Sequence, residues 1–218
     1  MSDAGIAEST VVGFLIAFAI GSIPFGYLIG RIFYRTDIRS QGSGNIGAMN
    51  ALRALGKGGA VAVLLLDALK GFGPVFAVYA IVRAQGSSFD FDGLPPGDQI
   101  VASAVAAGAV LGHCFSPWLR FKGGKGVATS FGAVFAMSWL CGLVAVGGWI
   151  AGALTTRYSS VGSMIGSCLA PVALWFFTRS LPFTAYGIFA ALLVIYTHRE
   201  NVARLRAGTE GPIRLSRR

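Results

Sequence analysis

Long apolar runs alternate with short polar segments along this chain, a pattern typical of a membrane protein with several helices. The first run is Val11–Gly30, and about 20 helical residues cross the hydrocarbon core of a bilayer. Pro24 and Gly26 are expected to kink this helix near its end. The later runs suited to single spans are Ala60–Val82, Gln99–Leu111, Ser159–Phe177 and Leu181–Thr197.

The apolar stretch 127–156 is long for one span and short for two. We expect a short helical hairpin that turns near Trp139–Gly142. A single long, tilted helix is the alternative, and it would give six spans instead of seven. Only the hairpin places the basic C-terminal tail on the same side as the earlier basic loops, so the positive-inside rule favours it.

The sequence therefore predicts an all-α, polytopic membrane protein that forms a single domain over residues 1–218. It has seven transmembrane helices, with the N-terminus outside and the C-terminus inside. Small-xxx-small pairs such as Gly148/Gly152 and Gly162/Gly166 are expected to let these helices pack closely.

Composition supports this interpretation and excludes several others. The chain is 54% hydrophobic and 12% charged, whereas about 25% of residues are charged in ordinary globular proteins. The net charge of +9 comes from basic residues in short segments between apolar runs, so it indicates membrane orientation rather than nucleic-acid binding. The acidic segment 83–98, with Asp90 and Asp92, is expected to be an outer loop. The three cysteines form no CxxC pair, and we expect neither a disulfide nor a metal site.

Two charged residues, Asp67 and Lys70, lie inside the second predicted span. A charged pair within a membrane helix is costly unless it is partnered. Mutual pairing is the simplest interpretation, with a secondary role in orienting the first polar segment.

A glycine-rich stretch, Phe121–Thr129, reads FKGGKGVAT. Glycines let the backbone turn sharply and expose its N–H groups, and lysine beside such groups suits a phosphate. The apolar run from Val127 could begin a helix whose N-terminus also favours anions. The stretch is not a Walker A loop, because Lys125 is followed by Gly126 rather than by serine or threonine.

The predicted topology collects three unusual polar segments on one face. They contain glycine, short hydroxyl or amide residues, cations and both histidines of the chain, but no carboxylate pair suited to metal or glycosidic chemistry and no GxSxG serine. Such residues suit an anionic ligand rich in phosphate. The segments are Gly42–Arg53 (GSGNIGAMNALR), His113–Thr129 (HCFSPWLRFKGGKGVAT) and His198–Glu210 (HRENVARLRAGTE).

In this order and at these distances, the three segments resemble the signature motifs of the bacterial acyl-phosphate:glycerol-3-phosphate acyltransferases of the PlsY type. The resemblance implies an enzyme of the bacterial inner membrane whose active site faces the cytoplasm. It would move a fatty acyl group from acyl phosphate to the 1-hydroxyl of sn-glycerol 3-phosphate, the first acylation step of phospholipid synthesis. The products would be 1-acylglycerol 3-phosphate (lysophosphatidate) and phosphate. Further matches are Gly21–Arg31 (GSIPFGYLIGR), Asp37–Arg39 (DIR) and Leu65–Gly71 (LLDALKG).

The resemblance and the chemistry together imply roles for particular residues. Arg53 and Lys125 would hold the substrate phosphates. Ser43 and Asn201 would bind glycerol 3-phosphate. These four residues and His198 are the expected catalytic residues. The backbone of the glycine-rich loop would cradle the acyl phosphate. The full set of expected substrate-binding residues is Gly44, Asn45, Gly47, Asn50, Lys122, Gly123, Gly124, Gly126, Thr129 and Glu210. The cations remove any need for a metal, no cofactor is expected, and the enzyme is expected to act as a monomer within the lipid bilayer.

Several alternatives stay open at this point. His198 is the candidate general base by its ordinary pKa range, but a substrate phosphate oxygen could take the proton while His198 orients the glycerol. Either Lys122 or Lys125 could contact phosphate while the other extends to the membrane surface. Met49 stands where the family usually has threonine, which weakens the case for substrate contact at position 49.

Two other residues have simpler expected roles. His113 is expected to cap or orient its loop rather than react, and Glu210 could pair with an arginine of its own segment or with Arg53. The alternative function is a membrane transporter of phosphorylated metabolites, which would use the same cations. The location of all three segments on one face argues against transport, because a transporter needs polar residues near the midplane of the membrane.

Overall fold

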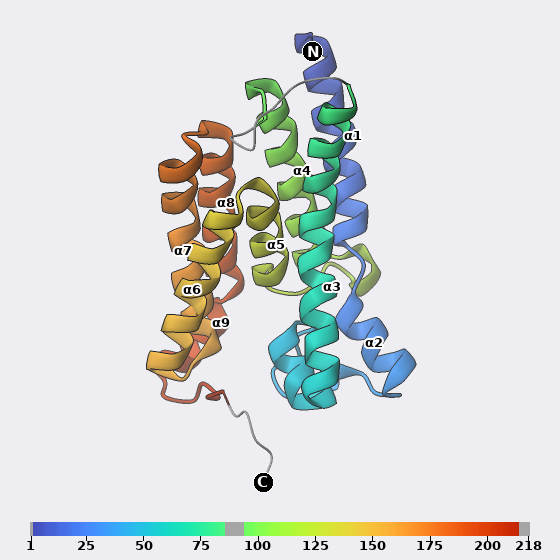
Figure 1. The fold of residues 1–218 in the computed structure, drawn as a ribbon. Coiled ribbons are helices and arrows are strands. Elements are labelled where there is room, and N and C mark those ends of the chain that lie inside the picture. Colours follow the sequence, from blue (N-terminus) through green and yellow to red (C-terminus); the bar gives the residue numbers. More distant parts are fainter. Residues whose placement is uncertain (1, 86–93, 214–218) are drawn as a thin grey trace.

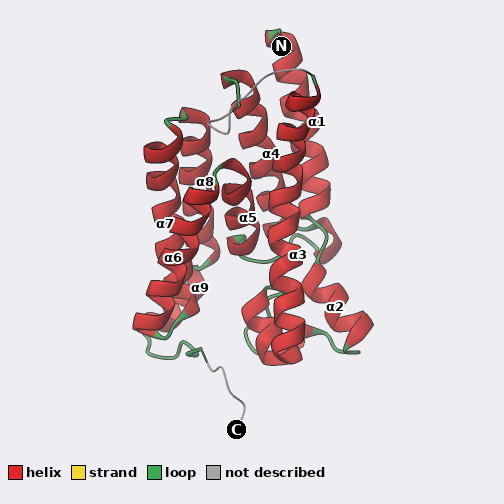
Figure 2. Ribbon diagram, viewed as in Figure 1, coloured by secondary structure: helices red, strands yellow, loops and turns green. Residues whose placement is uncertain are grey.

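The computed structural model describes residues 2–85 and 94–213, and within these ranges every regular element is a helix (Figure 2). The predicted loop residues Asp90 and Asp92 lie outside the described residues. The helices stand side by side in one bundle, with the two termini at opposite ends (Figure 1). In order, the elements are α1 (Asp3–Gly21), α2 (Phe25–Phe33), η1 (Ile38–Ser40), α3 (Ala48–Ala84), α4 (Pro96–Cys114), η2 (Pro117–Leu119), α5 (Val127–Met137), α6 (Trp139–Thr156), α7 (Ser159–Thr178), α8 (Leu181–Thr197) and α9 (Arg199–Arg206).

Among the described residues, five segments are long and apolar enough to cross a membrane. A sixth is added if α8 and α9, which meet at an angle of 53°, are taken together as one broken span. The prediction of an all-helical, multi-pass membrane protein is confirmed, while the count of seven spans and their orientation remain predictions. The five segments are Asp3–Phe33, Ala48–Ala84, Pro96–Leu119, Trp139–Thr156 and Ser159–Thr178.

The predicted hairpin in 127–156 is confirmed as two separate helices, α5 and α6. The chain leaves the helical conformation at Ser138, whose hydroxyl accepts a hydrogen bond from the Cys141 N–H at 3.5 Å and so caps α6. The turn lies one residue before the predicted position. With 11 residues, α5 is shorter than an ordinary span, and it lies in the middle of the bundle (Figure 1).

Two helices differ from their predicted outlines. The kink expected at Pro24 is a full break between α1 and α2. The second long helix begins at Ala48 instead of Ala60, and it changes direction at Gly56, where φ is 78°. The end of the first polar segment is therefore helical, which orients the side chain of Arg53.

The predicted close packing of small residues is confirmed between α6 and α7. A Cβ added to Gly162 would lie 2.3 Å from the Trp149 carbonyl oxygen, and one added to Gly166 would lie 2.3 Å from that of Ala145. Only residues without a side chain allow these backbones to approach so closely.

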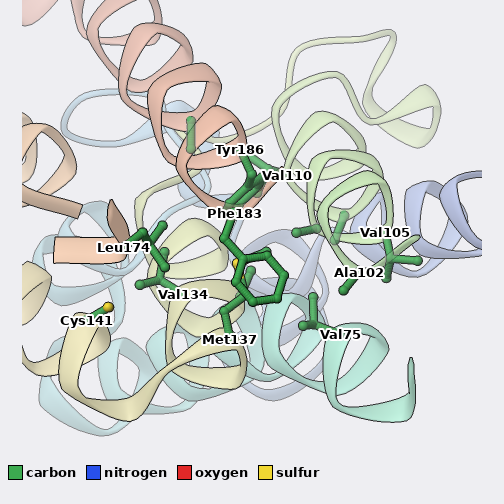
Figure 3. Close-up of a cluster of buried hydrophobic side chains, with 14 of the residues drawn as sticks. Val75, Ala102, Val105, Val110, Val134, Met137, Cys141, Leu174, Phe183 and Tyr186 are labelled. Carbon is green, nitrogen blue, oxygen red and sulfur yellow. The ribbon is translucent and has the colours of Figure 1, made fainter. Parts of the chain in front are cut away.

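The core lies where α3, α4, α5, α7 and α8 meet. Figure 3 shows Phe183, which is 1% exposed, among side chains that include Leu174, Val134, Met137 and Val75. Many large apolar side chains point outward instead, for example Leu154 at 73% exposed. A surface of this kind is expected of a protein whose helices face lipid.

Candidate active site

The first polar segment is folded around the buried side chain of Asn50. Its Oδ1 accepts a hydrogen bond from the Ser43 N–H at 2.9 Å, and its Nδ2 donates to the carbonyls of Ile38 and Asn45, both at 2.7 Å. These bonds go to the loop itself, so the geometry supports a positioning role for Asn50 and leaves the exposed Ser43 available to a ligand.

Other expected residues of this segment also shape the loop. Asn45 Oδ1 accepts from the Gly47 N–H at 2.8 Å. Gly44 has a φ of 68°, a conformation that residues with side chains rarely adopt. Met49 lies in the first turn of α3 and is half-buried.

The glycine-rich loop is attached to the end of α4 through its backbone. The N–H groups of Gly123 and Gly124 donate to the carbonyls of Cys114 and His113, both at 3.0 Å. The expectation that these two N–H groups face a phosphate is therefore corrected. The first N–H groups of α5, which follow Gly126, make no intrahelical hydrogen bonds and are the better candidates.

The remaining expected residues of the second segment have very different exposure. Lys122 is exposed and Lys125 is half-buried. Thr129 is 0% exposed, packs in α5 against Gly71 of α3, and its hydroxyl has no hydrogen-bond partner among the described residues. Lys125 is therefore the lysine that lies toward the other segments.

Lys125 and Asn201 bring the second and third segments together. The ammonium group of Lys125 donates a hydrogen bond to Asn201 Oδ1, and the Thr197 hydroxyl donates to the Lys125 carbonyl at 3.0 Å. Burial, together with the nearby positive charge of Arg204, lowers the pKa of Lys125 to about 8. The side chain remains largely charged at neutral pH.

His198 lies just beyond the last residue of α8, where the chain bends into α9. Its Nδ1 is 2.8 Å from the Val194 carbonyl oxygen. Because a carbonyl only accepts, Nδ1 carries the hydrogen and Nε2 is left as an acceptor. Burial and the charge of Lys125 lower the pKa of His198 to about 4, so the ring is neutral at neutral pH.

Glu210 holds the third segment together. Its carboxylate accepts hydrogen bonds from Asn201 Nδ2 at 2.6 Å, from Ser160 Oγ at 2.9 Å and from Arg204 Nε at 2.7 Å. The predicted pairing with an arginine of its own segment is confirmed. Burial acts to raise the pKa of Glu210, but these hydrogen bonds outweigh it and hold the pKa below its usual range.

Arg53 links the first segment to the third. Its Nη2 lies 3.4 Å from the carbonyl oxygen of Gly211, just after Glu210. Figure 1 shows the start of α3 and α9 at the end of the bundle that carries the C-terminus. The structure thus brings Lys125 and Asn201 into contact and places Arg53 against the chain just after the third segment. His198 follows Thr197, whose hydroxyl holds the Lys125 carbonyl. Asn50 and Thr129 are buried, and Lys122 is exposed.

Ser160 and Thr197 were not expected at the site from sequence. Each is an ordinary hydroxyl at the edge of an apolar helix, a position with no distinctive sequence signal. Within residues 2–85 and 94–213, no group of three or more His, Cys, Asp or Glu side chains could hold a metal ion.

Replacing Glu210 by alanine is expected to destabilise the protein by about 1–3 kcal/mol, because the Asn201 amide and the Ser160 hydroxyl lose their acceptor. Thermal unfolding of the purified protein in detergent would show a lower melting temperature. Glu200→Ala removes an exposed carboxylate from the same polar segment and is the matched control. Equal melting temperatures for the two variants would contradict the role given to Glu210.

Comparison with known proteins adds an independent finding. The family model described as "Glycerol-3-phosphate acyltransferase" matches residues 11–208. The chain is 41% identical over 203 residues to the glycerol-3-phosphate acyltransferase of Rhodopseudomonas palustris (strain BisB5), covering 93% of this chain and 95% of the relative. It is 42% identical over 209 residues to that of Bradyrhizobium diazoefficiens, covering 96% and 98%.

The fold is also similar to solved structures. The crystal structure of PlsY, an integral membrane glycerol 3-phosphate acyltransferase, in its glycerol 3-phosphate form has a TM-score of 0.83 and 36% identity, covering 94% of this chain and 96% of that one. The lysophosphatidic acid form has a TM-score of 0.80 and 35% identity, covering 95% and 96%.

Proposed function

Because this chain belongs to the glycerol-3-phosphate acyltransferase family of the PlsY type, we propose that it moves a fatty acyl group from acyl phosphate to the 1-hydroxyl of sn-glycerol 3-phosphate. The products are lysophosphatidate and inorganic phosphate. The observation that supports the proposal is the contact between the three segments: Lys125 donates a hydrogen bond to Asn201, and Arg53 lies 3.4 Å from the Gly211 carbonyl, just after Glu210. Membership of an acyltransferase family disfavours the transporter alternative.

Two phosphate groups must be held during this reaction, and the site offers two cations for them. Arg53 and Ser43 lie on the first segment and are assigned to glycerol 3-phosphate, together with Asn201. Lys125 and the first N–H groups of α5 are assigned to the acyl phosphate. Asn201 is already oriented by Glu210 at 2.6 Å, and such preorganised groups stabilise developing charge without having to move.

The properties of His198 favour an orienting role. A general base works best when its pKa is near the working pH, and the pKa of His198 is lowered to about 4 by burial and by Lys125. We assign its Nε2 to accept a hydrogen bond from the 2-hydroxyl of glycerol 3-phosphate and so to orient the glycerol, while a substrate phosphate oxygen takes the proton of the 1-hydroxyl. The hydroxyl oxygen then forms a bond to the acyl carbon, and the bond from that carbon to the phosphate oxygen breaks.

The test of this function uses the purified protein in detergent with acyl phosphate and glycerol 3-phosphate. Inorganic phosphate should be released only when both substrates are present, with one lysophosphatidate formed for each phosphate. Phosphate release that does not depend on glycerol 3-phosphate, or no release at all, would reject the proposed reaction.

The proposed setting is the bacterial inner membrane, with a monomer whose site faces the cytoplasm. Basic residues near the proposed site, such as Arg53 and Lys57, support this orientation through the positive-inside rule. In sealed right-side-out vesicles, a Lys57→Cys variant should resist an impermeant thiol reagent and react after lysis. Labelling before lysis would show that this end of the bundle faces outward, opposite to the proposed orientation.

The activity is expected to fall as the pH rises through about 8, because Lys125 then loses its charge and kcat/KM reports ionisations of the free enzyme. His198 is neutral above about pH 4, so it causes no decline between about pH 5 and 8. Lys125→Arg keeps a charge at high pH. Its residual activity should lack the alkaline fall, and an identical fall in both proteins would contradict the assignment to Lys125.

A further inference from the structure

A charged group is buried inside the bundle, apart from the residues already assigned to the substrates. Lys70 Nζ is 2.8 Å from Asp67 Oδ1, and both side chains are 2% exposed. His113 Nδ1, on α4, is 3.5 Å from the same carboxylate oxygen, with 4% of its side chain exposed. We call Asp67, Lys70 and His113 the buried charge cluster. Charges in a membrane helix are costly and usually serve a function, so simple mutual pairing leaves their purpose open.

One arm of the cluster reaches the first polar segment. Lys70 Nζ also donates to the Ile23 carbonyl at 2.9 Å, in the break between α1 and α2. Shortly after this break, Gly26 packs so tightly that an added Cβ would lie 1.9 Å from the Ile46 carbonyl oxygen. Ile46 belongs to the first segment and is 2% exposed. Lys70 therefore holds the backbone on which this segment rests.

The other arm reaches the glycine-rich loop. A Cβ added to Gly124 would lie 1.9 Å from His113 Nε2, so the imidazole lies directly against this glycine. The His113 carbonyl accepts the Gly124 N–H at 3.0 Å. Lys125 is the next residue. Because Asp67 contacts Nδ1 of the ring, it orients the surface on which the loop lies.

The approach to the glycine-rich loop is tied to the same break in the chain. Ser116 Oγ donates to the Ser22 carbonyl at 2.6 Å, and Trp118 Nε1 donates to Ser22 Oγ at 2.9 Å. The break between α1 and α2 is thus held from one side by Lys70 and from the other by the chain that leads into the loop.

From these contacts we infer that the buried charge cluster is a positioning site that sets the first polar segment and the glycine-rich loop relative to each other. His113 orients the loop that carries Lys125, and Lys70 orients the segment that carries Ser43 and Arg53. Asp67 joins the two arms. This inference rests on the proposed function for its readout, because each segment is assigned to one substrate.

The test compares two apolar replacements that each remove one arm. His113→Leu should raise KM for acyl phosphate at least about tenfold and KM for glycerol 3-phosphate less than about threefold. The reason is that a misplaced binding group weakens the binding of the substrate that it holds. Lys70→Met should show the opposite pattern. Tyr79→Phe is the matched control. Tyr79 lies on α3, as Lys70 does, and its hydroxyl donates a hydrogen bond to the Met137 carbonyl at 3.1 Å. Its replacement should change neither KM value.

The outcomes separate this inference from the proposed function. The wild-type assay with both substrates tests the reaction itself. If His113→Leu raised mainly KM for glycerol 3-phosphate and Lys70→Met mainly KM for acyl phosphate, the positioning site would be supported. The assignment of substrates to segments would then be reversed. Equal changes in both KM values, or a change confined to the amount of folded protein, would overturn the inference. If the apolar replacements do not fold, His113→Asn and Lys70→Gln retain a donor near Asp67 and permit the same comparison.

Discussion

Replacing Lys125 by methionine is expected to lower kcat/KM by about a thousandfold, the size of effect seen when one preorganised charge-stabilising group is removed. Lys125 is the half-buried cation of the glycine-rich loop and contacts Asn201. Methionine keeps most of the length and the apolar stem, but it provides no charge for a phosphate. The helices should be unaffected, because the side chain lies in a loop before α5.

The matched control is Lys122→Met, in the same loop. Lys122 is exposed, and its replacement should leave kcat/KM within about threefold of wild type, as expected of a surface position. The measurement is phosphate release in detergent, with the melting temperature of each variant recorded alongside. Near-normal activity of Lys125→Met would show that the glycine-rich loop is not where the reaction occurs.

The second large effect is expected from Gly123→Ala, which should reduce kcat/KM about a hundredfold, since a misplacement of about 1 Å can cost that much. The added Cβ would lie 2.0 Å from the His113 carbonyl oxygen and 2.7 Å from that of Cys114. Both are backbone atoms at the end of α4 and cannot rotate away. The loop must shift instead, and Lys125, two residues later, would shift with it.

Gly147→Ala provides the matched control, because an added Cβ on this α6 glycine would meet nothing within 4 Å. It should retain normal activity. The same assay and melting measurements apply to both variants. If Gly123→Ala turned over substrate as fast as the control, the loop would tolerate the extra atom and the close contact with α4 would not position Lys125.

The sequence alone was sufficient to predict the helices and the kind of ligand. In lipid, backbone groups must be satisfied within the segment, so long apolar runs can only form helices. The distribution of basic residues predicted the hairpin that became α5 and α6, because orientation follows charge. Glycine, amide and cation-rich segments predicted phosphate binding by their residue types, and their order predicted the family confirmed by comparison.

The tertiary structure alone decided what each polar group contacts. Glu210 meets Ser160, 50 residues earlier, and His113 meets Asp67, because distant parts of the chain pack against each other. The spacing of residues along the chain does not predict such contacts. The N–H groups of Gly123 and Gly124 looked available in sequence, but they are used to attach the loop to α4. Residue type thus determined which chemistry was present, and packing determined which of these groups remain free to perform it.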